Sequence, residues 1–294
     1  MAKVNLFWNP AGFELDSLGT KQLTKISDGD TPQVSFSIRM LSIDTPEVHY
    51  PGTQSPSKHD SKLTQLADWI QQGKAPIDGA LGDHLRPKLA TGNAGTLQKQ
   101  QGDLAAKAFQ DLLDAKLTKS NGRKRSVFLR SADEKFDQYG RVLAYVAPSY
   151  EPAELAGMTL LQRATFNLLM VDSGWAAPFP IYPSLPKYTD LVLFQSVAEE
   201  AMVQKRGTYA DPLSLTGYEF RMCYRLWEVT DDLQKGKKLS ESERSGWIER
   251  FCVDMTTRQI FFPHDYHRVL PCNRVFIWPK DANDAAGKLN LTPA

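Results

Sequence analysis

The chain carries arginines and carboxylates in three short segments whose spacing would let them act together. Residues 44–47 read DTPE, and Arg39 lies five residues before Asp44. Residues 137–141 read DQYGR, and residues 28–31 read DGDT. A cation held by carboxylates, two fixed guanidinium groups and a carboxylate beside a water are the parts needed to cleave a phosphate diester. The three segments therefore predict a phosphodiesterase.

Each segment also has an ordinary structural interpretation. A Thr at the start, a Pro at the first helical position and a Glu in the first turn are typical of a helix N-terminus, which would account for residues 44–47. Residues 137–141 are typical of a hairpin turn, and residues 28–31 of a loop. These interpretations leave Arg39 unexplained, because it interrupts an otherwise apolar strand. The occurrence of all three segments in this order favours a site over three separate turns.

The composition is that of an ordinary globular protein. The 294 residues are 41% hydrophobic and 23% charged, which suits one large or two modest domains. The net charge is +1, so a positive field for an anionic substrate has to be built locally. Three cysteines without a dense spacing argue against a disulfide framework and favour buried thiols (Cys223, Cys252 and Cys272).

Neither the interior nor the start of the sequence predicts membrane insertion. No apolar run is long enough to span a bilayer. Residues 1–10 lack a basic segment followed by a long apolar stretch and a cleavage site. We therefore expect a cytoplasmic protein from the sequence as written, or a secreted one if an export signal was removed from it.

Hydrophobic periodicity predicts strands and helices up to Pro212. Val34, Phe36 and Ile38 alternate with polar residues, so residues 21–43 are predicted to be strand-like. Residues 50–101 are rich in Gly and Pro and predict a long irregular insertion with one short helix near residues 63–70. The other predicted elements are strands at 126–131 and 141–147, joined by a hairpin turn at Gly140, and helices at 103–117, 159–173 and 190–206.

Beyond Pro212 the pattern changes. Residues 218–226 alternate between apolar and polar types, and further strands are predicted at 248–254, 259–262 and 274–278. We therefore divide the chain into residues 1–212, which contain every candidate site residue, and residues 213–294, a small mainly-β domain of unknown function.

The three segments and their order resemble those of the thermonuclease family, to which staphylococcal nuclease belongs. The resemblance is carried by residues 28–31 (DGDT), 39–47 (RMLSIDTPE) and 137–146 (DQYGRVLAYV), with helices following in the matching order. It covers about residues 22–212 apart from the insertion. It implies an α+β fold in which a five-stranded OB-like β-barrel packs against three helices.

The resemblance also implies a role for individual residues. Asp30, Asp44 and the carbonyl oxygen of Thr45 would bind Ca²⁺, an ion that prefers oxygen ligands. Glu47 would act on the attacking water, as general base or as its positioner. The reaction would be the hydrolysis of DNA or RNA to leave 3′-phosphate ends.

Four further residues would contact the substrate. Arg39 and Arg141 would hold the phosphate, which a planar guanidinium fork meets better than an ammonium does. Tyr139 and Tyr182 would flank the nucleotide. The segment between Asp30 and Arg39 is shorter than in the staphylococcal enzyme, so a short hairpin is expected there. The insertion at 50–101 directly follows the catalytic loop, and is either a surface excursion or a cover for the substrate.

A second interpretation is a catalytically inactive relative that binds nucleic acid or protein as a scaffold. Inactive copies usually lose the charged site residues, whereas this chain keeps all of them (Asp30, Arg39, Asp44, Glu47 and Arg141). We therefore favour an active nuclease. The preference for DNA or RNA stays open, as does a protein partner bound through residues 213–294.

Overall fold

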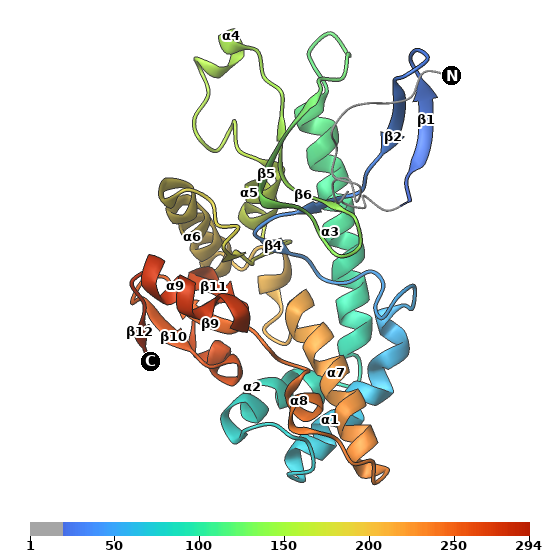
Figure 1. Ribbon diagram of the computed structural model, residues 1–294, viewed down its shortest axis with the longest axis vertical. Coiled ribbons are helices and arrows are strands. Elements are labelled where there is room, and N and C mark those ends of the chain that lie inside the picture. The colour runs from blue at the N-terminus through green and yellow to red at the C-terminus, as the bar shows by residue number, and fades with distance from the viewer. Residues whose placement is uncertain (1–19) are drawn as a thin grey trace, which may run out of the picture.

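The computed structural model describes residues 20–294 (Figure 1), so the expectation for residues 1–10 lies outside the described residues. The strands are β1 (Gln22–Ile26), β2 (Pro32–Ser35), β3 (Ile38–Met40), β4 (Ile43–Asp44), β5 (Val127–Phe136), β6 (Val142–Pro148), β7 (Ala177–Pro178), β8 (Ile181–Tyr182), β9 (Phe251–Asp254), β10 (Gln259–Phe261), β11 (Arg274–Ile277) and β12 (Thr292–Pro293). The α-helices are α1 (Asp60–Gln71), α2 (Gly79–Leu89), α3 (Ala94–Leu117), α4 (Pro152–Leu155), α5 (Phe166–Asp172), α6 (Tyr188–Val203), α7 (Gly217–Gln234), α8 (Glu241–Ser245) and α9 (Ala282–Lys288).

The strands that carry the candidate residues form small sheets. Strands β3, β6 and β5 make one sheet in that order, β4 pairs with β7, and β1 pairs with β2. The β1–β2 hairpin is exposed along its whole length and pairs with no other strand among the described residues. The α+β class is therefore confirmed, but the described strands do not close a barrel, because the hairpin stands apart from the β3–β6–β5 sheet (Figure 1).

Three helices cover these sheets. The side chains of α3, α5 and α6 join β4 and β6 in one apolar cluster, which includes Ile43, Ala105, Val146, Phe166 and Phe194. The order of the three helices is as predicted, although α3 begins nine residues earlier and α5 is shorter than expected. Gly174 follows α5 with φ +74°, and Gly140 lies in the β5–β6 turn with φ +69°, so both glycines occupy the left-handed conformation that the sequence required of them.

The segment 50–101 is more regular than predicted. Its middle forms α2, and its end is the beginning of α3, so the prediction of a single short helix is wrong. Leu81, Leu85 and Leu89 recur every four residues on α2 and are fully buried against α1 and α7. Their burial outweighs the unfavourable helix propensity of Gly82 and Pro87, which hid the helix in the sequence.

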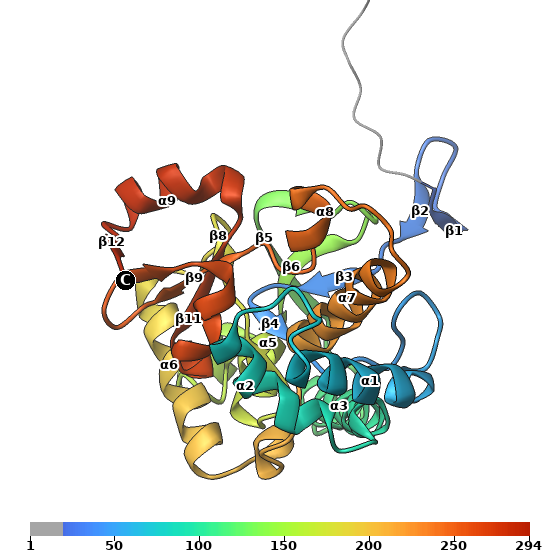
Figure 2. The ribbon, with the colours of Figure 1, turned by 90° about the horizontal axis from the view of Figure 1, so that it is seen from below.

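The segment 218–226 is a helix and not a strand. Its apolar residues alternate, but they also recur at intervals of three and four residues, and a helix buried on more than one side satisfies both patterns. The helix starts with a reciprocal cap, in which the hydroxyl of Thr216 accepts from the Glu219 N–H and the carboxylate of Glu219 accepts from the Thr216 N–H. Helix α7 then packs on α1 and α3 (Figure 2).

The predicted strands beyond residue 248 are present as β9, β10 and β11. They form a five-stranded sheet in the order β12-β10-β9-β11-β8, beside which α9 packs. Strand β8, which belongs to the first of the two predicted domains, pairs in parallel with β11. The domain boundary at Pro212 stays a prediction. Residues on both sides of it contribute strands to this sheet, and α7, which follows it, packs on α1 and α3, which precede it.

Two expectations drawn from composition bear on the described residues. All three cysteines are buried free thiols, as predicted. In residues 20–294, the helices are too short or too polar to cross a bilayer.

Candidate functional site

The pairing of β3 with β6 brings the two candidate arginines to one side of their sheet. The strands are parallel, and Arg39 is opposite Leu143. Arg141 directly precedes β6 and is two residues before Leu143, the spacing at which side chains of a strand share a face, so we infer that it projects from the same face as Arg39. The buried amide of Asn167 on α5 fastens this arrangement, since it accepts from the Val146 N–H at 2.9 Å and donates to the Leu41 carbonyl at 2.8 Å.

The hairpin turn at residues 137–141 fixes the guanidinium of Arg141. One carboxylate oxygen of Asp137 accepts from the N–H groups of Tyr139 and Arg141 at 2.9 and 3.0 Å. The other accepts from Arg141 Nε at 2.7 Å. Burial would raise the pKa of Asp137, but these bonds hold that pKa below its ordinary value. Tyr139 is exposed, and its ring lies 5.4 Å from the guanidinium of Arg141.

The loop after β4 is held between two helices, and each approaches it with a glycine. A Cβ on Gly102 of α3 would lie 2.7 Å from the carbonyl oxygen of Glu47. A Cβ on Gly217, the first residue of α7, would lie 2.3 Å from the carbonyl oxygen of Thr45. Any larger residue would push the helix away from the loop. The positions of Asp44 and Glu47 are therefore set by α3 on one side and by α7 on the other.

Asp44 is buried and both of its carboxylate oxygens are hydrogen-bonded. Oδ1 accepts from Arg221 Nη2 at 2.9 Å and from Arg39 Nη2 at 3.4 Å. Oδ2 accepts from the N–H of Tyr218, in the first turn of α7, at 2.6 Å. Burial alone would raise the pKa of Asp44, but the attraction of Arg221 and Arg39 holds that pKa below its ordinary value. Asp44 is therefore ionised at neutral pH.

Glu47 shares the same guanidinium. Its Oε1 accepts from Arg221 Nη1, and its main-chain N–H donates at 2.7 Å to the side-chain oxygen of Gln98, whose amide nitrogen donates to the carbonyl of Leu215. Burial raises the pKa of Glu47, and the neighbouring carboxylate of Asp44 adds to this, so the pKa lies above its ordinary value even though Arg221 lowers it. A raised carboxylate pKa suits a general base.

Of the other three predicted residues, two lie away from this cluster, and the third, Thr45, lies within its loop. Asp30 lies in the exposed turn of the β1–β2 hairpin, where its carboxylate accepts from the Thr31 hydroxyl at 3.1 Å. Figures 1 and 2 both separate this hairpin from β4. Tyr182 is buried beneath α9, and its hydroxyl donates to Asp284, so it does not lie beside Tyr139. The carbonyl of Thr45 is covered by Gly217.

These contacts decide whether the oxygens assigned to Ca²⁺ fit that ion. Ca²⁺ takes six to eight oxygen ligands. Here both oxygens of Asp44 already accept hydrogen bonds, the Thr45 carbonyl faces a helix backbone, and Asp30 is elsewhere. Within residues 20–294, the His, Cys, Asp and Glu side chains form no group of three or more suited to a metal ion. In this arrangement the residues therefore do not fit Ca²⁺.

Arg221 is the residue that sequence reasoning missed. It lies 177 residues after Asp44, and its segment was taken for a strand of a separate domain. The start of the helix could have been found, because Thr216 and Glu219 have the spacing of a capping box. Nothing in the sequence indicates that this helix begins against Asp44, which is a matter of tertiary packing.

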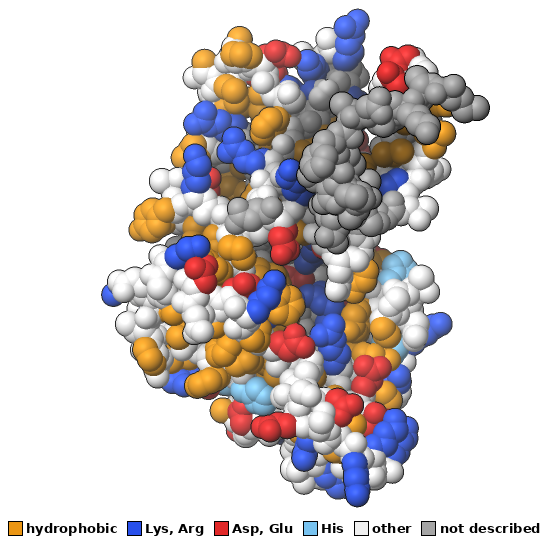
Figure 3. Space-filling model, in the orientation of Figure 1, with side chains coloured by type: hydrophobic (Ala, Val, Ile, Leu, Met, Phe, Trp, Pro, Cys, Tyr) orange, Lys and Arg blue, Asp and Glu red, His pale blue; other side chains and the backbone are white. Residues whose placement is uncertain are grey.

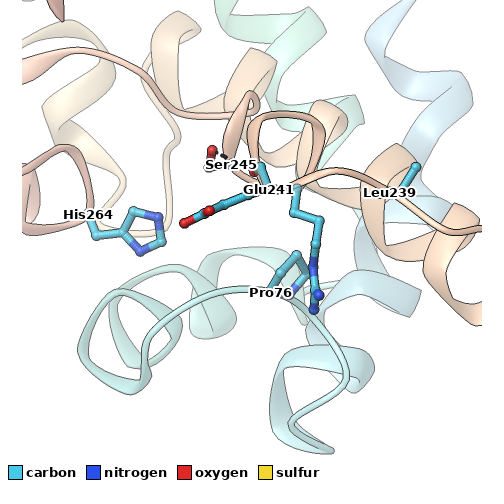
Figure 4. Close-up of a pocket in the computed structure, with 6 residues that line it drawn as sticks. Pro76, Leu239, Glu241, Ser245 and His264 are labelled. Atoms are coloured by element: carbon cyan, nitrogen blue, oxygen red, sulfur yellow. Dashed lines mark hydrogen bonds between the residues drawn. The ribbon is translucent and has the colours of Figure 1, made fainter.

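A hollow of about 500 Å³ lies away from this cluster, between α8 and the segment that precedes α2 (Figure 4). It is lined by Ser245 and His264, and His264 Nδ1 is bonded to Asp78 Oδ2 at 2.7 Å, which places the residue types of a hydrolase triad near one another. The hydroxyl of Ser245, however, donates to the backbone carbonyl of Glu241. Asp78 also caps α2 through the N–H of Leu81. These bonds stabilise the ends of helices, so Ser245 and Asp78 are not arranged as parts of a catalytic triad.

A buried carboxylate on α7 is likewise structural. Glu219 accepts hydrogen bonds from His84, Lys88 and Tyr266, at 3.0 to 3.1 Å, in addition to its bond to Thr216. Burial would raise the pKa of Glu219, but Lys88 and His84 hold it well below its ordinary value. Its oxygens are all used, so this group anchors α7.

Comparison with known families identifies the part of the chain that carries the candidate site. The family model described as staphylococcal nuclease homologue matches residues 37–211, which include Arg39, Asp44, Glu47 and Arg141. Asp30 and Arg221 lie outside the matched residues. No curated protein matches the chain.

Proposed function

Because the chain belongs to the family of staphylococcal nuclease homologues, we propose that it is a nuclease that hydrolyses the phosphodiester bonds of DNA or RNA. The observation that carries the proposal is the gathering of Arg39, Asp44 and Glu47 in one cluster, with Arg141 on the same face of the β3–β6 sheet. Hydrolysis of a phosphodiester needs such groups from the protein: two guanidinium groups to bind the phosphate and a carboxylate of raised pKa to act on the water.

Each group has a role in the proposed reaction. Glu47 takes the proton of the attacking water. Its raised pKa makes the carboxylate a stronger base than an ordinary Glu. Arg39 and Arg141 hold the oxygens of the phosphate, on which negative charge gathers as the bond to water forms. The bond between phosphorus and the 5′ oxygen breaks, the 5′ oxygen takes up a proton from solvent, and the phosphate stays on the 3′ end. Tyr139, exposed beside Arg141, is positioned to stack on a base.

We further propose that the nuclease activity depends on Ca²⁺. The ion would supply additional positive charge at the phosphate. The oxygens of Asp44 can accept it only where Arg221 does not hold them, so we propose Ca²⁺ dependence for a state in which that ion pair is broken. The assignments of Asp30 and of the Thr45 carbonyl as ligands would need a larger rearrangement.

The local charge is consistent with an anionic partner. On the face seen in Figure 3, Lys and Arg side chains lie over both halves of the molecule, and fewer Asp and Glu side chains lie beside them in the upper half. With a net charge of only +1, such a local excess is how the chain can attract nucleic acid.

One observation favours the alternative, a catalytically inactive nucleic-acid or protein scaffold. Arg221 binds both carboxylates of the candidate site, which neutralises the charges that a metal ion would use. A scaffold would keep Arg39, Arg141 and Tyr139 for binding and would leave phosphodiester bonds intact.

The test is to incubate the purified full chain with end-labelled single-stranded DNA, duplex DNA and RNA, with about 10 mM Ca²⁺, with Mg²⁺ or with chelator. Glu47→Gln, purified in parallel, controls for contaminating nucleases. We expect Ca²⁺-dependent cleavage of at least one substrate, 3′-phosphate ends, and poor activity with Mg²⁺. Binding without cleavage under every condition would overturn the nuclease proposal in favour of the scaffold.

A further inference from the structure

The first turn of α7 takes every oxygen of the 44–47 loop that the family resemblance assigns to the cation. Tyr218 and Arg221 occupy the two oxygens of Asp44, and Gly217 lies against the carbonyl of Thr45. Arg221 also holds Glu47. These contacts come from one helical turn, so they form together when α7 docks.

The charges of the cluster are balanced without an added ion. The carboxylates of Asp44 and Glu47 are balanced by the guanidinium groups of Arg221 and Arg39, and the N-terminus of α7 adds partial positive charge beside Asp44. Burial would lower the pKa of Arg221, but the two carboxylates raise it above its ordinary value, so Arg221 stays charged at any ordinary pH. A divalent cation would therefore meet a neutral cluster in which its ligands are already used.

Helix α7 itself is firmly held. Phe220, Met222, Cys223 and Leu226 are buried in the apolar cluster that α7 shares with α1 and α2. The side chain of Arg221, by contrast, is 23% exposed. The guanidinium can leave the carboxylates by rotating about its own side-chain bonds, while the helix stays in place.

We propose that Arg221 is a built-in competitor of the divalent cation at the Asp44–Glu47 pair. Its guanidinium occupies the cation's place and keeps the site closed, and a divalent ion binds there only when Arg221 is displaced. The inference rests on the proposed function in that it concerns the same carboxylates, but it is tested by cation binding and not by cleavage.

The experiment measures the thermal unfolding of the full chain in chelator and in about 10 mM Ca²⁺, because an ion that binds only the folded state raises the melting temperature. For the wild type we expect only a small shift, because Ca²⁺ must displace Arg221 before it binds. Arg221→Gln should gain a rise of at least about 2 °C and a Ca²⁺ affinity at least tenfold tighter by calorimetry. The matched control is Arg225→Gln, one turn further along α7, where the side chain contacts the Tyr50 hydroxyl at 3.3 Å outside the site. It should behave as the wild type.

Adding Asp44→Asn to Arg221→Gln should remove the new Ca²⁺ response, which locates the ion. Two results overturn the proposal: a wild type that Ca²⁺ stabilises as much as it stabilises Arg221→Gln, or a cooperatively folded Arg221→Gln that gains no binding. Arg221→Met, which keeps the volume without a polar group, replaces the Gln variant if the latter does not fold. Ca²⁺ binding gained by Arg221→Gln without cleavage of any nucleic acid would refute the nuclease function and leave the competition intact.

Discussion

Gly217→Ala tests whether the contact between α7 and the 44–47 loop is as tight as the structure makes it. The new Cβ would lie 2.3 Å from the Thr45 carbonyl oxygen and 2.8 Å from Asp44 Oδ2, whereas ordinary contact begins at 3.4 Å. The first turn of α7 must therefore retreat by roughly 1 Å. Neither neighbour can yield easily, since one is backbone and the other is a buried carboxylate.

The retreat has two costs. Overpacking typically costs about 1–3 kcal/mol. Lengthening the 2.6 Å bond from the Tyr218 N–H to Asp44 removes a hydrogen bond to a charged group, which contributes about 1.5–3 kcal/mol. Replacing Gly by Ala in a helix returns about 0.5–1 kcal/mol. The free energy of unfolding should fall by about 2–5 kcal/mol, and this is measured by urea denaturation.

The matched control for this substitution is Gly79→Ala. Gly79 is the first residue of α2, as Gly217 is of α7, but a Cβ there would meet no atom within 4 Å. The control should leave the free energy of unfolding unchanged or raise it by about 0.4–1 kcal/mol. If Gly217→Ala is as stable as its control, α7 does not bear on the loop as described, and the account of the closed site fails with it.

Three further predictions concern the chemistry and the anchoring of the site. Glu47→Gln should slow cleavage by about 10²–10⁴-fold, with nucleic-acid affinity near normal. In the wild type, the rate should fall at acid pH with a pKa above the ordinary Glu value of 4.5, because Glu47 must lose its proton to act as a base. The variant should lack this acid limb, and an unchanged pH–rate profile would exclude Glu47 as the base. Arg141→Lys keeps the charge but not the fork that binds Asp137, and should lower kcat by about 10²-fold; full activity in this variant would place the phosphate elsewhere. Lys88→Met leaves the Glu219 charge buried without its main partner and should lower the free energy of unfolding by about 3–5 kcal/mol in chemical denaturation, whereas Lys107→Met, which breaks an exposed pair, should change it by less than about 0.5 kcal/mol.

The sequence by itself determined the local elements of the candidate site. The β5–β6 hairpin followed from Gly140, whose positive φ the turn requires, and from alternating strands on either side of it. The resemblance to the nuclease family followed from the spacing of Arg39, residues 44–47 and residues 137–141, and the family match over residues 37–211 confirms it. Such features depend on neighbours within a few residues, which a single sequence displays directly.

Only the tertiary structure decided how these elements are joined. Leu81, Leu85 and Leu89 form a helix because α1 and α7 bury them, although local propensity argues against a helix there. The alternation of apolar and polar residues at 218–226 suits a strand as well as a buried helix. The segment forms a helix because the surrounding fold buries it on more than one side.

The same holds for the state of the candidate site. Asp44 was predicted to bind an ion with Asp30, and that role stays a prediction; in the structure its carboxylate accepts a hydrogen bond from Arg221, 177 residues later in the chain. Coulomb attraction and close packing act between whatever groups the fold brings together, regardless of their separation in sequence. The sequence therefore identified the two carboxylates, but only the packing of α7 determined that they form ion pairs with Arg221.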